Sequence, residues 1–90
     1  MDYLNNLKLE VMTTTYVINS NSPIIYVLHD DEGNWTFLSA DTIEESDAMV
    51  VSLEEIIEFD PSVVKVLFMP ICHEAYRTDI NAEWRILPKN

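Results

Sequence analysis

The sequence predicts an α+β fold: an antiparallel sheet of four to five strands with two consecutive helices, about 52–59 and 61–69, packed on one face. Short runs of β-branched and aromatic residues alternate with turn-forming residues, which is typical of strands. A capped segment with helical apolar spacing follows them. The chain has 90 residues, too few for two separate cores, so residues 1–90 are expected to form a single domain.

The first elements are read from composition. Residues 1–10 are polar with scattered apolar positions, and fit either a short helix or an irregular start. Residues 13–19 (TTTYVIN) are β-branched and aromatic, which favours a strand. Residues 19–23 (NSNSP) predict a turn, whose exit Pro23 fixes.

A hairpin is expected next. Two apolar runs, 24–29 (IIYVLH) and 34–39 (NWTFLS), flank the turn residues DDEG, and so predict two antiparallel strands. Strand alternation places Trp35 and Phe37 on one face. Gly33 is the only glycine of the chain, and we expect it to take the positive φ that this turn requires.

A connector and a fourth strand follow. Residues 40–48 are acidic and are expected to hold one helical turn, capped by Asp41 or Thr42. Residues 48–52 (AMVVS) are short and apolar, which predicts a buried strand that shares the sheet core with 24–29.

The clearest helix begins after Ser52. The sequence SLEE matches a capping box, in which the Ser52 hydroxyl accepts from the backbone N–H of Glu55 and Glu55 reaches back to Ser52. Leu53, Ile56 and Ile57 have the spacing of a helix that packs on a sheet.

The second helix is delimited by prolines. Asp60 precedes Pro61, so the first helix should end there, and Asp60 can cap a helix over 61–69 that ends at Pro70. In the tail, 73–77 (HEAYR) suggests a helical turn. The stretch 83–87 (EWRIL) suggests a last edge strand with Trp84 in the core.

The strongly negative net charge limits the kinds of partner that the protein is expected to bind. Sixteen Asp and Glu oppose five Lys and Arg, a formal net charge of -11. Such a chain repels nucleic acid and anionic membranes and attracts basic proteins, although acidity also serves solubility alone. No apolar run reaches the length of a membrane span, and no secretory signal is recognisable at the start, so a cytoplasmic protein is expected.

The stretch HDDEG (29–33) is the first candidate for chemistry. A calcium loop needs oxygen ligands at alternate positions, whereas these carboxylates are consecutive and point in different directions. The pattern therefore favours a hairpin turn, with a weak cation site or a partner-contacting acidic tip as alternatives. We predict no metal and no cofactor.

Catalytic patterns are not recognisable. Cys72 is the only cysteine, which excludes an intramolecular disulfide, and its neighbour His73 is badly placed to activate it. No nucleophile elbow, phosphate loop or H-E-x-x-H pattern occurs. We therefore expect no enzyme and no catalytic residues. The acidic clusters remain as candidates for contact with a basic partner: Asp30, Asp31, Glu32, Glu44, Glu45 and Asp47.

A set of motifs resembles a known family. A G-x-W-x-F strand precedes an acidic connector, an L-x-x-I-x-x-x-D-P-S junction and a proline-led segment that ends in arginine. The matching residues are Gly33, Trp35, Phe37, Val51, Leu53, Ile56, Asp60, Pro61, Ser62, Pro70, Ile71, Ala75 and Arg77. Over about residues 24–77 the chain is similar to a family of small bacterial domains grouped with the immunity proteins of polymorphic toxin systems.

One residue departs from that family's pattern. Cys72 stands where the family usually has glycine, so a left-handed turn there would strain the chain by about 1 kcal/mol or more. The resemblance carries no functional residues over, because the matched positions are framework.

The resemblance implies a non-catalytic acidic protein of immunity type that sequesters a cognate toxin. The alternative is a homo-oligomeric accessory or regulatory domain, and a homodimer is left open.

Overall fold

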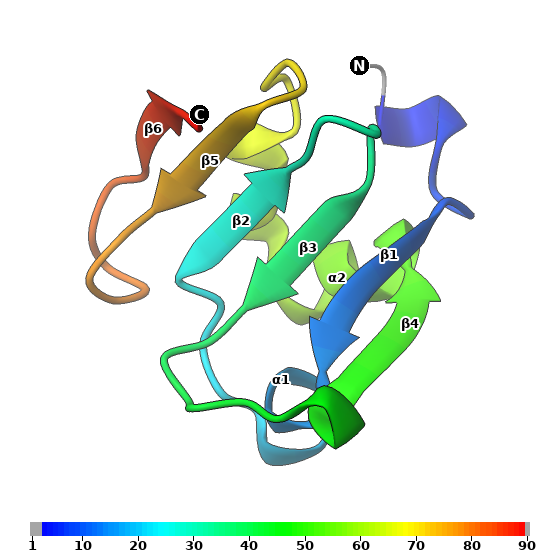
Figure 1. The fold of residues 1–90 in the computed structure, drawn as a ribbon, viewed down its shortest axis with the longest axis vertical. Coiled ribbons are helices and arrows are strands. Elements are labelled where there is room, and N and C mark those ends of the chain that lie inside the picture. The colour runs from blue at the N-terminus through cyan, green and yellow to red at the C-terminus, as the bar shows by residue number, and fades with distance from the viewer. Residues whose placement is uncertain (1–2, 90) are drawn as a thin grey trace.

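The computed structural model describes residues 3–89 and has an α+β fold built on one six-stranded mixed sheet, in the order β4-β1-β3-β2-β5-β6 (Figure 1). The strands are β1 (Glu10–Thr14), β2 (Tyr26–His29), β3 (Trp35–Leu38), β4 (Ala48–Ser52), β5 (His73–Tyr76) and β6 (Arg85–Pro88). The α-helices are α1 (Thr15–Ser20) and α2 (Leu53–Phe59), and the 3-10 helices are η1 (Tyr3–Asn5), η2 (Glu45–Asp47) and η3 (Pro61–Val66).

The α+β class is confirmed, but the predicted antiparallel sheet of four or five strands is wrong. The sheet has six strands, and β1 runs parallel to β3, with Met12 beside Thr36. Strand β1 lies between β3 and β4. It pairs parallel with β3 and antiparallel with β4.

The first strand lies earlier than predicted. Residues 13–19 were expected to be a strand, but β1 ends at Thr14 and α1 follows directly. The Thr14 hydroxyl accepts the backbone N–H of Val17 at 3.3 Å, and Asn21 closes the helix at φ 56°. These two caps override the strand propensity of the residues between them.

The hairpin is confirmed. Strands β2 and β3 pair antiparallel with His29 opposite Trp35, and Gly33 has φ 85° in the turn. Trp35 and Phe37 are both buried on one face, as alternation predicts. The first of these strands is shorter than expected, since β2 begins at Tyr26.

Strand β4 has the predicted bounds, but the prediction that it is buried is wrong. It lies at the edge of the sheet, where only Val51 is buried and Val50 is 57% exposed. The helical turn before it is η2, which is capped by Glu44. Asp41, one of the expected caps, instead accepts the Ser39 hydroxyl at 2.7 Å.

The helix after Ser52 is confirmed as α2. The Ser52 hydroxyl accepts the N–H of Glu55 at 3.2 Å, and the Glu55 carboxylate reaches back to that hydroxyl at 3.5 Å. The following segment is capped by Asp60, as expected, but is a 3-10 helix that ends at Val66. Its β-branched valines and the approaching Pro70 disfavour a longer α-helix.

The tail adds two strands. The prediction of a helical turn at 73–77 is wrong, because β5 pairs with β2 on one side and β6 on the other. Non-local pairing decides here, since it buries Ala75 completely against the core. The expected edge strand is confirmed as β6, but it begins two residues later than predicted, at Arg85, and ends at Pro88.

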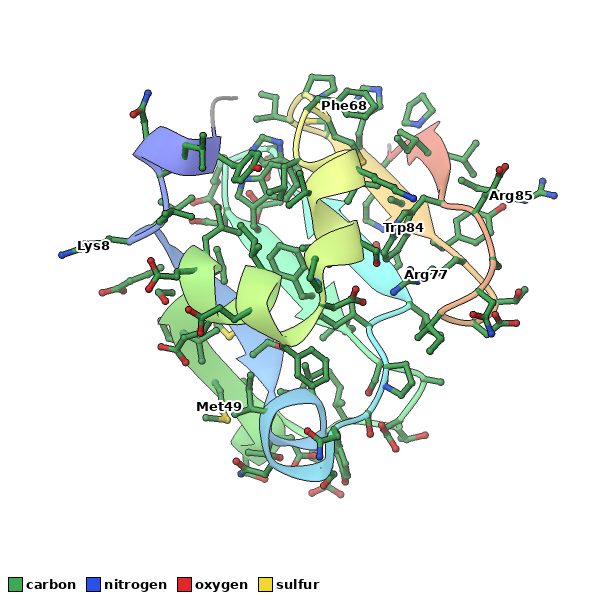
Figure 2. All side chains as sticks on the ribbon, turned by 180° about the vertical axis from the view of Figure 1, so that it is seen from behind. Lys8, Met49, Phe68, Arg77, Trp84 and Arg85 are labelled. Carbon is green, nitrogen blue, oxygen red and sulfur yellow. The ribbon has the colours of Figure 1, made fainter. Side chains whose placement is uncertain are left out.

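The core lies between one face of the sheet and the helices. Side chains from the sheet, among them Val27 and Phe37, pack with Leu53 and Ile56 of α2 and Val63 of η3. Figure 1 shows α2 behind the sheet, and Figure 2 shows the same helices from their own side. The helices therefore lie on one face, as predicted, and the opposite face carries no described helix. None of the described helices is long and apolar enough to cross a membrane.

Candidate functional site

The uncovered face of the sheet carries a row of side chains that crosses all six strands. The register aligns Val50, Met12, Thr36, Leu28, Glu74 and Leu87, and we call these residues the cross-sheet row. Each precedes or follows a core-facing residue such as Val11 or Val27, so alternation points the row away from the helices. Val50 is 57% exposed, Leu87 45% and Met12 39%. The row is thus largely apolar and accessible.

A polar border runs beside the row, towards the end of the sheet that carries the β2–β3 turn. Its residues are Ser52, Glu10, Asn34, Asp30, Cys72 and Lys89. Glu10 pairs with Ser52, the Asp30 N–H donates to the Asn34 carbonyl at 3.0 Å, and the Lys89 N–H donates to the Cys72 carbonyl at 2.8 Å. The row and the border together form the candidate site.

Two hollows lie along this border and share Asp30. One has a volume of about 380 Å³ and is lined by Glu10, Met12, Asp30, Thr36 and Val50, among others. The other has a volume of about 550 Å³ and is lined by Leu28, Asp30, Asp31, Cys72 and Lys89. Each hollow therefore combines apolar walls with two carboxylates.

The turn holds Asp30 in place. Its Oδ1 accepts the backbone N–H groups of Glu32 and Asn34, both at 2.9 Å, which closes the turn that the sequence predicts. No described residue donates to Oδ2. Asp30 thus lines both hollows with one carboxylate oxygen that has no donor among the described residues.

The six acidic residues predicted to contact a partner separate into two groups. Asp30 and Asp31 line the larger of the two hollows, and Glu32 is exposed beside them in the turn. Glu44, Glu45 and Asp47 lie in and beside η2, at the opposite end of the sheet (Figure 1). There the Glu44 N–H donates to the Asp47 carboxylate at 2.8 Å, so part of this group stabilises its own turn. One contact surface of ordinary size centred on either group would leave the other at its margin.

One acid of the row is tied to its neighbours. The Tyr26 hydroxyl donates to the Glu74 carboxylate at 2.7 Å, and Lys89 lies 3.4 Å from the same oxygen. Burial, followed by this hydrogen bond, raises the pKa of Tyr26 to about 12. The same hydrogen bond, followed by the charge of Lys89, lowers the pKa of Glu74. Glu74 is thus held as a carboxylate.

The two histidines have structural contacts, and Cys72 is a free thiol. The His29 ring stacks on Trp35 at 3.9 Å, and its Nδ1 lies 2.9 Å from the Met69 carbonyl. Nδ1 of His73 lies 3.0 Å from the Ile71 carbonyl. Within residues 3–89, no three side chains of His, Cys, Asp or Glu are grouped to hold a metal ion.

Sequence reasoning missed a buried arginine cluster on the other side of the sheet. Arg77 is 5% exposed, donates to Asp60 at 2.6 Å and to Ser62 at 2.9 Å, and contacts the Ile24 carbonyl with two nitrogens. The guanidinium also lies 4.1 Å from the ring centroid of Trp84 (Figure 2). The signal was present in the D-P-S junction, because Asp60 and Ser62 both bind this arginine. Trp84 is half-buried, so the expectation of a core position holds only in part.

Comparison with known proteins gives no match: no family model, no curated protein and no solved structure is similar to this chain. The shape and charge of its own surface are therefore the basis for proposing a function.

Proposed function

We propose that the protein is a non-catalytic acidic binding protein that sequesters a basic protein, and that this partner is a cognate toxin, as for the immunity proteins that its motifs resemble. The observation that carries the proposal is the unpaired surface charge. Among the described residues, only Asp60 and Glu74 of the Asp and Glu side chains form ion pairs. The net charge of -11 is thus carried mainly by carboxylates without a cationic neighbour.

Unpaired negative charges on the surface affect both the stability of the protein and its rate of association with a partner. They repel one another and so destabilise the folded chain, and a basic partner relieves this repulsion on binding. They also steer a cationic protein towards the surface and accelerate association, an effect that salt screens. A toxin with a cationic cleft, such as a nuclease, has the complementary charge.

The test is affinity capture from the lysate of the source organism at low and high salt, followed by co-expression. We expect recovery of a basic protein that binds less strongly at high salt, inhibits growth when expressed alone, and is harmless when this chain is co-expressed. A captured protein that has no toxicity, or whose toxicity this chain leaves intact, would contradict the assignment.

Charge reversal tests the steering. Glu44→Lys with Glu45→Lys should slow association with the captured protein and weaken its salt dependence. Glu54→Lys with Glu58→Lys on α2 is the matched control for net charge alone. If neither double substitution changed the association rate, charge would not direct the approach of the partner to this protein.

A second function is a homo-oligomeric accessory domain. The observation in its favour is that β4 and β6 are sheet edges and carry the exposed apolar residues Val50 and Leu87. Sedimentation equilibrium of the isolated chain distinguishes the two functions. A stable dimer at micromolar concentration would favour the accessory domain, and a monomer would favour the sequestering protein.

A further inference from the structure

We propose that the basic partner docks on the uncovered face of the sheet, with an apolar centre over the cross-sheet row and arginine or lysine side chains in the two hollows that meet at Asp30. This inference rests on the proposed function and assigns its binding surface. It places the acidic turn of η2 outside the contact.

The apolar side chains are aligned across the sheet, with Thr36 between Met12 and Leu28 and with Glu74 between Leu28 and Leu87. Single exposed apolar residues are ordinary on a protein surface, but here they come from separate strands and lie in register on one face. Val50, Met12, Leu28 and Leu87 belong to four different strands. A protein interface has this composition at its centre, where apolar groups exclude water from the contact.

The charges that line the two hollows indicate which kind of partner binds there. The smaller hollow is lined by Glu10 and Asp30 and by no lysine or arginine. The larger hollow has Asp30 and Asp31 against one cation, Lys89, which lies 3.4 Å from Glu74. Both hollows therefore favour a cationic side chain with an aliphatic stem, since the stem can lie on the apolar walls.

The same charges disfavour two other occupants. A second copy of this chain, docked face to face about a two-fold axis that passes near Asp30, would bring like carboxylates together. A nucleic acid would bring its phosphates to them. A basic protein is left as the occupant that complements both the row and the border.

The probe for the test is a synthetic amphipathic helical peptide, with a leucine stripe bordered along one side by arginines. Two control peptides replace the arginines by glutamates or the leucines by serines. The readout is the change in backbone amide chemical shifts of the full, isotope-labelled chain. We expect the largest changes at Met12, Leu28, Thr36 and Asp30 with the first peptide, and smaller changes with both controls.

Variants then separate the two contributions. Met12→Thr with Val50→Thr should weaken binding of the arginine–leucine peptide about tenfold. Phe68→Ser is the matched control, because Phe68 is 64% exposed and lines neither hollow, since it lies between η3 and β5. Glu10→Gln should weaken binding and reduce its salt dependence, whereas Glu54→Gln on α2 should not.

Shift changes centred on η2, equal binding of the three peptides, or equal effects of Phe68→Ser and Met12→Thr with Val50→Thr would overturn the inference. The proposed function would survive if a captured toxin still bound through the connector. Conversely, if the peptide bound at this face but no toxin were captured, the proposed docking surface would stand and the proposed toxin partner would be wrong.

Discussion

Cys72 allows backbone strain to be measured at a single position. It has φ 62°, in the left-handed region, immediately before β5, and the Lys89 N–H holds its carbonyl at 2.8 Å. A side chain with a Cβ costs about 1–2 kcal/mol in that conformation. Glycine removes this cost but loses about 0.5–1 kcal/mol more backbone entropy on folding. We therefore expect Cys72→Gly to stabilise the protein by up to about 1.5 kcal/mol.

The assay is urea unfolding followed by tryptophan fluorescence. Cys72→Ala is the matched control, since alanine removes the thiol and retains the Cβ, and it should not gain this stability. An unchanged dependence of the unfolding free energy on urea would show that stability has changed without a change in the compactness of the unfolded state. If Cys72→Gly were no more stable than Cys72→Ala, the left-handed backbone would carry no strain and the reasoning would be wrong.

Three further predictions concern stability. Asp60→Ala should destabilise the protein by about 3–5 kcal/mol, because it leaves the buried Arg77 without its anion, and thermal unfolding by circular dichroism measures the loss. Burial raises the pKa of Tyr26 from its ordinary value of 10.0 to about 12 in the folded chain. The unfolded chain thus loses its proton first, so stability present below pH 10.0 should fall as the pH rises to about 12. Tyr26→Phe should remove that part of the alkaline loss in unfolding experiments at increasing pH. Ser52→Ala should cost about 1 kcal/mol by removing the cap of α2, and an equal midpoint of urea unfolding would contradict this.

Local signals predicted the parts of the fold that local hydrogen bonds determine. Ser52 caps α2, Asp60 caps η3 and Gly33 takes positive φ because each acts within a few residues of its partner. The α1 helix was missed although its cap is equally local. Thr14 and Asn21 flank residues of high strand propensity, and their two caps outweigh that propensity in the fold.

Non-local pairing explains the other errors. The segment 73–77 has no strand pattern strong enough to identify it, and β5 forms because β2 offers it a partner on one side and β6 on the other. In the same way, the exposure of Val50 follows from the position of β4 in the strand order, which composition does not specify.

Part of the candidate site could be predicted from the sequence. Asp30 and Asp31 were identified by their charge, and the turn that holds Asp30 was identified by its residues. The position of Asp30 beside Glu10 depends on the parallel pairing of β1 with β3, between residues more than twenty positions apart. No pattern within either segment records that register.

The position of β1 also sets an order of events during synthesis. Both of its neighbours, β3 and β4, lie later in the chain, so β1 leaves the ribosome long before either strand exists. The β2–β3 hairpin needs only a short loop closure and can form first, whereas β1 must wait for residues of high sequence separation. Until β3 and then β4 emerge, the newly made chain carries β1 with unpaired backbone groups, and such an unpaired strand is exposed to aggregation and to chaperones.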